Sequence, residues 1–174
     1  MDFFSLKEKI ENADCVLIGI GEEFREKECS KDKLDKAYKN LSDCLEGKNY
    51  FVLNICDDKV IYDAGFDENR IAAPFCDICE DSDFSQNNPF DREKNPMWGK
   101  YTKWLSYTIK NKLLIIELGC LMGSMEVVRW PFEKTVMLNN KSELVRINEK
   151  FPFVPAEISE KSFSVMCNSV DFLI

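Results

Sequence analysis

Residues 15–21, with the sequence CVLIGIG, decide the fold of this chain. A short apolar run that ends in glycines is typical of a strand buried on both faces, because no polar residue alternates with the apolar ones. Comparable runs follow at 50–54, 113–118, 143–147 and 163–166. We predict a parallel β-strand at each of the five places.

Amphipathic segments separate these strands. Phe3, Leu6 and Ile10 recur at helical spacing, and the same apolar pattern returns over residues 34–45. Further short helices are predicted at 57–64, 98–109, 125–130 (disturbed by Pro131) and 168–173. Strands that alternate with helices predict an α/β fold with a doubly wound parallel sheet, which is Rossmann-like. We expect one domain over 1–174, with an irregular acidic loop near 75–97.

Composition excludes several classes of function. The 174 residues carry a net charge of -8 and no histidine, so we expect no nucleic-acid partner and no catalysis or metal binding through His. No apolar run approaches the roughly 20 residues of a membrane helix, and the first residues lack the basic region of a signal peptide. Eight irregularly spaced cysteines fit reduced thiols in a cytoplasmic protein.

Ligands of doubly wound sheets bind beyond the carboxyl ends of the strands. That rule selects the residues that follow the predicted strands as a cofactor site: Gly19, Gly21, Gly119, Ser124 and Asn148. Glu22 and Glu23 follow the glycine turn, however, and place two carboxylates where a pyrophosphate would lie. The turn is therefore either a weak nucleotide site or a tight turn that uses glycine.

The cysteine pair Cys76 and Cys79 has the spacing of half a zinc site. Structural zinc needs four ligands, and a third sulfur from Cys56 with an Asp would be a strained set, so we predict no bound metal. A redox pair is the second alternative, and unremarkable thiols are the favoured one. Asp57, Asp58 and the carboxylates within 77–83 either hold a divalent cation or form a solvated loop, and we favour the loop.

Four segments in this order resemble the sirtuin family, most closely its bacterial branch linked to ADP-ribosylation. ADCVLIGIG (13–21) is similar to the first strand and its Gly-Ala-Gly turn. NYFVL (49–53) and AGFD (64–67) are similar to the second strand and the segment after its Thr-Gln-Asn-x-Asp motif. LIIELG (114–119) with RWPFEK (129–134) resembles the strand and helix around a Gly-Thr-Ser-type loop, and VRIN (145–148) the strand whose Asn contacts the adenosine ribose.

The resemblance implies a Rossmann domain with an inserted zinc module, and NAD-dependent deacylation or ADP-ribosyl transfer. This chain departs from the family at the reacting centre. Cys56 stands at the motif's Asn, while Asp58 matches its Asp, and the catalytic His position falls near Phe75, which cannot act as a base. The zinc module is reduced to the loop after Cys76.

We therefore expect a sirtuin-like domain with a degenerate active site, serving as a non-catalytic binding or assembly module. NAD or ADP-ribose would bind weakly at best, with contacts from Gly19, Gly21, Asp58, Gly119, Ser124 and Asn148. The alternative is an NAD-dependent deacylase or ADP-ribosyltransferase with rearranged catalytic residues, for which Asp58 and Cys56 are the candidates. The expected partners are another protein or a second copy of the chain, without nucleic acid or membrane.

Overall fold

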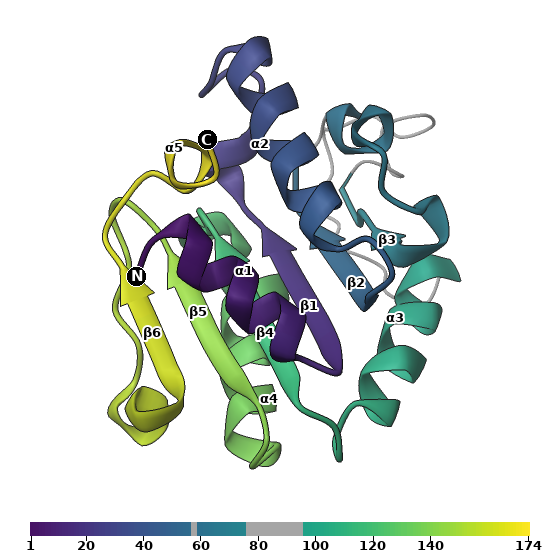
Figure 1. The fold of residues 1–174 in the computed structure, drawn as a ribbon, viewed down its shortest axis with the longest axis vertical. Helices are drawn as coiled ribbons and strands as arrows, with labels where there is room; N and C mark the ends of the chain where they lie inside the picture. The colour runs from purple at the N-terminus through teal and green to yellow at the C-terminus, as the bar shows by residue number, and fades with distance from the viewer. Residues whose placement is uncertain (57–58, 76–95) are drawn as a thin grey trace, which may run out of the picture.

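The computed structural model describes residues 1–56, 59–75 and 96–174, which contribute six parallel strands to one sheet (Figure 1). The strand order is β3-β2-β1-β4-β5-β6. The strands are β1 (Cys15–Ile20), β2 (Asn49–Asn54), β3 (Ile71–Ala72), β4 (Leu113–Leu118), β5 (Glu143–Ile147) and β6 (Ser162–Val165). Asp57, Asp58 and the pair Cys76 and Cys79 lie outside the described residues.

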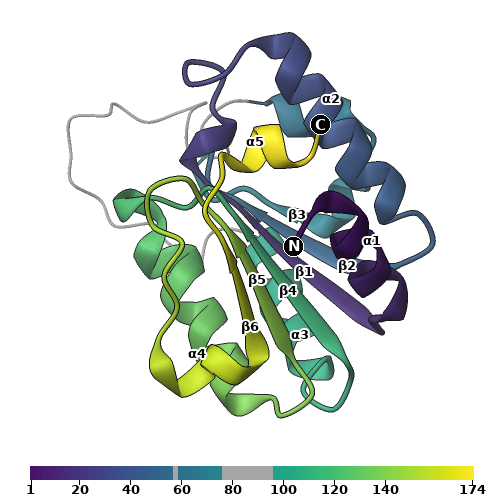
Figure 2. The ribbon, with the colours of Figure 1, turned by 60° about the vertical axis from the view of Figure 1, so that its left-hand side comes forward.

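Helices cover both faces of the sheet, as Figures 1 and 2 show from two directions. One face carries α1 (Phe3–Asn12), α2 (Lys31–Cys44) and α5 (Ser169–Phe172), and the other carries α3 (Pro96–Tyr107) and α4 (Trp130–Leu138). Short 3-10 turns lie at Glu22–Phe24, Val60–Ala64, Glu68–Arg70, Met122–Ser124 and Ala156–Lys161, and a π-helical turn at Met125–Arg129. Within the described ranges, no helix is both long and apolar enough to cross a membrane.

Strand β1 contributes side chains to the core on both faces of the sheet. Val16, Ile18 and Ile20 pack under α1 and α2, whereas Cys15 and Leu17 pack under α3 and α4. This alternation explains why the run has no polar residue: both of its faces are covered. The prediction of a doubly wound α/β sheet is confirmed.

One strand was missed, and two predicted helices are present in a different form. Strand β3 was missed, because two residues carry no periodic pattern. The helix expected over 125–130 and disturbed at Pro131 is a π-helical turn, Met125–Arg129, which leads directly into α4 with Pro131 in the first turn of α4. Only Val60–Ala64 of the helix expected over 57–64 is described, and it is a 3-10 turn.

The chain reverses its winding between β1 and β4. After β1 it passes through α2 on one face to reach β2, and after β4 it passes through α4 on the opposite face to reach β5. The connections that leave β1 and β4 therefore diverge at the carboxyl ends of two neighbouring strands. In open α/β sheets such a switch point is the usual place for a ligand crevice.

Gly19 and Gly99 offer a matched test of this packing. A Cβ on Gly19 would lie 2.4 Å from Val128 Cγ1 and 2.6 Å from the Phe132 ring, whereas a Cβ on Gly99 in α3 would meet nothing within 4 Å. We expect Gly19→Ala to lower the free energy of unfolding by about 1–3 kcal/mol through overpacking. Gly99→Ala should raise it by about 0.5–1 kcal/mol, since alanine favours helix. Urea unfolding measures both; equal effects would contradict the packing of β1 against α4.

Candidate functional site

The carboxyl ends of the central strands bring together three of the residues predicted to bind a cofactor. Gly21 donates its N–H to Leu118 O (2.7 Å), Gly119 to Ile147 O (2.9 Å), and Asn148 to Val165 O (3.1 Å). Each of these residues ends its own strand and bonds to the neighbouring one. Gly21, Gly119 and Asn148 thus stand in a row along the edge where a crevice would open.

Glu22 turns its side chain into this edge rather than toward solvent. Its carboxylate accepts hydrogen bonds from the backbone N–H of Leu121 (2.7 Å) and from the Ser124 hydroxyl (2.9 Å). Glu22 is 7% exposed and Ser124 is fully buried. Ser124, predicted as a cofactor contact, therefore binds an anion that the protein itself supplies.

Glu23 does the same on the other side of the turn. Its two carboxylate oxygens accept from the backbone N–H of Glu149 (3.0 Å) and from both the N–H (2.7 Å) and the hydroxyl (2.6 Å) of Ser169. Glu23 is 8% exposed. The two glutamates together take five donors at the ends of β4, β5 and β6, which is the type of donor that elsewhere binds phosphate.

The glycines leave room for the protein's own backbone. A Cβ on Gly21 would lie 2.4 Å from Cys120 Cα, so the turn after β1 touches the turn after β4. Gly119 has φ of +62°, and a Cβ there would lie 2.5 Å from Glu23 Cβ. Gly19 lies below this level, against α4. Close approach is what glycine permits at these positions, and the approaching group is another part of the chain.

Asn148 is fully buried, and its side chain closes the loop that follows β5. Its Nδ2 donates to Cys120 O (2.7 Å), while its Oδ1 accepts from the N–H groups of Lys150 (3.0 Å) and Phe151 (2.7 Å). These bonds tie the loop after β5 to the turn after β4. Both ends of the amide are thus engaged inside the protein.

Of the two catalytic candidates, Cys56 is among the described residues and Asp58 is not. Cys56 is buried, and its thiol donates to the Gly21 carbonyl (3.4 Å). Asn54, also buried, accepts from the Cys56 N–H (3.2 Å), and among the described residues its Nδ2 has no hydrogen-bond partner. Asp58 lies outside the described residues, so its roles as a catalytic candidate and a cofactor contact stay predictions.

Cys120, a second thiol at this edge, is chemically quiet. Burial, reinforced by the charges of Glu117 and Glu22, raises the pKa of the Cys120 thiol well above its usual value. The reactive form of cysteine is the thiolate, which this environment suppresses. Among the described residues, no group of three or more Cys, Asp or Glu side chains is arranged to hold a metal ion.

A buried ionic cluster beneath this edge was not predicted. Glu117 of β4 is fully buried and accepts from Arg129 Nε (3.1 Å), Arg129 Nη2 (2.9 Å) and Arg146 Nη2 (2.7 Å). Arg146 lies directly across from it on β5 and also pairs with Glu133 (2.8 Å). Burial works against the charged guanidinium, but these carboxylates outweigh it and raise the pKa of Arg146. The available signal was the presence of Glu117 and Arg146 inside the apolar runs of β4 and β5.

The cluster also holds the loop after β5. Arg129 donates to the carbonyls of Phe151 (2.7 Å) and Cys120 (3.3 Å), and Arg146 donates to the carbonyl of Phe153. Two guanidiniums thereby fix the backbone that supplies donors to Glu23. The ionic cluster and the hydrogen bonds of Glu22 and Glu23 at the strand ends therefore form one connected network.

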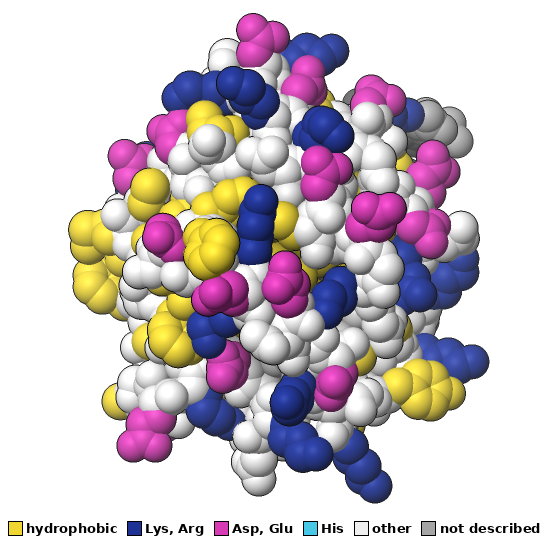
Figure 3. All heavy atoms as spheres, viewed as in Figure 1, with side chains coloured by type: hydrophobic (Ala, Val, Ile, Leu, Met, Phe, Trp, Pro, Cys, Tyr) yellow, Lys and Arg dark blue, Asp and Glu magenta, His cyan; other side chains and the backbone are white. Residues whose placement is uncertain are grey.

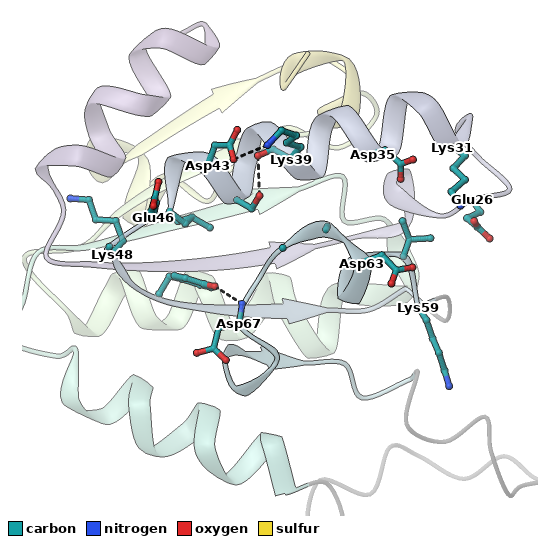
Figure 4. Close-up of a pocket in the computed structure, with 17 residues that line it drawn as sticks. Glu26, Lys31, Asp35, Lys39, Asp43, Glu46, Lys48, Lys59, Asp63 and Asp67 are labelled. Carbon is teal, nitrogen blue, oxygen red and sulfur yellow. Dashed lines mark hydrogen bonds and ion pairs between the residues drawn. The ribbon is translucent and has the colours of Figure 1, made fainter.

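A groove of about 1040 Å³ lies elsewhere, between α2 and residues 59–67 (Figure 4). Six carboxylates and four lysines line it, and Lys39 pairs with Asp43 (3.3 Å). Figure 4 shows the labelled side chains spread along the groove instead of converging on one point. Charges of both signs at this spacing favour no single ligand chemistry.

No protein-family model matches this chain, and no curated protein matches it. The resemblance to sirtuins thus stays a prediction carried by the residues quoted above. A Rossmann-like sheet supports many functions, so the fold alone does not choose among them.

Glu117→Gln tests the ionic cluster. Removing the charge leaves Arg129 and Arg146 buried without their shared carboxylate, and we expect a loss of about 3–5 kcal/mol in the free energy of unfolding. The control is Asp43→Asn, which breaks an exposed ion pair and should cost less than about 0.5 kcal/mol. Chemical denaturation of both variants measures the difference. A loss below 1 kcal/mol for Glu117→Gln would show that the cluster carries little stability.

Proposed function

We propose that this chain is a sirtuin-like domain with a degenerate active site, acting as a non-catalytic binding or assembly module. Its affinity for NAD or ADP-ribose is weak at best, and its location is the cytoplasm. One observation carries the proposal: Glu22 and Glu23 occupy the backbone donors at the switch point with their own carboxylates. The donors that a pyrophosphate would need are already taken.

Charge and desolvation support weak binding. A phosphate 4 Å from a carboxylate is repelled by about 4 kcal/mol per charge pair at an effective dielectric of 20. For phosphate to use these donors, both glutamates must leave them, and each hydrogen bond to a charged group is worth about 1.5–3 kcal/mol. The described residues at this edge therefore do not fit a dinucleotide.

The residues of the expected reaction centre support the absence of catalysis. By the resemblance, Phe75 stands at the position of the catalytic His, and here it packs half-buried against the core under α3 and α4. A phenyl ring takes up no proton, and losing a general base typically costs about 10²–10⁴-fold in rate. Cys56, at the motif's Asn, is buried and donates to a backbone carbonyl.

Titration calorimetry with NAD and ADP-ribose tests the binding half of the proposal. We expect the wild-type chain to show no dissociation constant below about 1 µM. Glu22→Gln/Glu23→Gln should bind ADP-ribose about tenfold more tightly than Glu26→Gln/Glu28→Gln, which removes the same charge from exposed positions that follow the turn. Submicromolar binding of NAD by the wild type would contradict the proposal.

Release of nicotinamide from NAD tests the catalytic half. Purified protein incubated with NAD, acyl-lysine peptides and acceptor proteins is expected to release none above the uncatalysed background, because the site lacks an oriented base. Turnover that disappears in Cys56→Ser or Asp58→Asn would overturn the non-catalytic role. It would favour an NAD-dependent deacylase or ADP-ribosyltransferase that uses those two residues.

A further inference from the structure

Strand β6 leaves one side of its backbone open. Among the described strands it is the outermost at its end of the sheet, and it pairs with β5. Since Val165 O accepts from Asn148 N, the backbone groups of Val165 and Phe163 face β5 and those of Ser164 face outward. Within the part of the chain that the structure describes, no backbone hydrogen bond reaches the Ser164 N–H from that outer side. The edge thus offers a free donor and free acceptors.

The side chains along this edge carry no charge that would prevent pairing with another strand. Residues 162–170, SFSVMCNSV, contain no charge in a chain whose net charge is -8. Natural edge strands usually carry lysine, proline or an inward-pointing charge that prevents pairing with another strand. The opposite edge, β3, is only two residues long and has little backbone to offer. The two edges of the sheet are therefore not equivalent.

Exposed hydrophobic side chains lie beside β6. Phe163 in β6 is 40% exposed, and Met166 directly after it is 69% exposed. Figure 3 shows hydrophobic side chains gathered on the side of the molecule where Figure 1 places β6 and the start of α1. Lys9 sits over the Phe163 ring (4.0 Å) and pairs with Glu143 (2.5 Å), so the nearest charges neutralise each other. We call Phe163, Ser164 and Met166 the edge patch.

We propose that the edge patch binds a second copy of this chain, with β6 pairing antiparallel to the partner's β6 about a two-fold axis at Ser164. Two six-stranded sheets then become one continuous sheet. This inference rests on the assembly role proposed above and names its partner. A two-fold contact of this type uses the same surface on both chains, so it closes as a dimer and leaves no β6 edge free.

The geometry of this pairing is self-complementary. Ser164 donates its N–H to the carbonyl of the partner's Ser164 and accepts in return, while Phe163 faces the partner's Val165 across the two strands. Aromatic and β-branched side chains are a favourable cross-strand pair. Two chains of charge -8 repel each other, so they can approach closely only through a surface without net charge. The stretch 162–170 is such a surface.

The size of the edge patch sets the strength of the dimer. The exposed parts of Phe163 and Met166 amount to on the order of 200 Å², judged from their exposed fractions and the usual area of large side chains. A stable dimer buries about 800 Å² on each partner. The remainder has to come from the backbone and its neighbours, so the dimer is expected to be reversible, with dissociation in the micromolar range.

Sedimentation and light scattering of the full chain test the dimer. Between about 1 and 200 µM, the mass should rise from 20.2 kDa toward twice that value. Met166→Lys places a charge in each half of the contact and should weaken the dimer at least about tenfold. Met122→Lys is the control, because Met122 is 68% exposed and lies in the turn after β4. Hydrogen exchange at the Ser164 amide should slow as the concentration rises.

The outcomes separate the two proposals. A mass of 20.2 kDa at every concentration, or equal weakening by both lysine variants, would overturn the dimer and leave the nicotinamide result untouched. A dimer that forms through β6 but releases nicotinamide would retain this inference and overturn the non-catalytic role. A dimer weakened by Met122→Lys alone would place the contact at another surface and overturn the inference.

Discussion

The contact of Glu117 with Arg129 and Arg146 is the constraint on which the rest of the structure depends. A carboxylate taken fully out of water costs several kcal/mol, and only well-placed partners offset that cost. Here two guanidiniums from different elements share one carboxylate, so β4, β5 and the turn before α4 have to meet at one point. Apolar packing alone would tolerate small slips between these elements, whereas a buried charge does not.

The same cluster also positions the backbone at the carboxyl ends of the strands. Arg129 and Arg146 also donate to the carbonyls of Phe151 and Phe153, which sets the backbone after β5. The N–H of Glu149 in that backbone binds Glu23. Glu22 then links the turn after β1 to the turn after β4. The closed switch point is thus the upper part of a polar network whose lower part is the ionic cluster.

Sequence reasoning was reliable where one physical pattern acted alone. Runs such as 15–20 and 113–118 predicted buried parallel strands, because covering both faces of a strand leaves one apolar signature. It failed where partners are distant in sequence. Glu22 and Glu23 were expected to lie where a phosphate would bind, but the sequence did not reveal that they accept hydrogen bonds from amides about 100 and 126–146 residues away. Glu117 and Arg146 were missed for the same reason, since nothing local reveals a cross-strand ion pair.

A closed switch point and an open sheet edge belong together in one physical account. Backbone donors at the strand ends have been satisfied from within, so burial at the crevice now serves stability. At β6 the opposite holds. Among the described residues, no backbone hydrogen bond reaches the backbone N–H of Ser164, and the side chains of Phe163 and Met166 are exposed. Unsatisfied backbone beside exposed apolar surface is what drives association. In this molecule the capacity for binding therefore lies at the edge of the sheet, away from the place where its fold would conventionally hold a ligand.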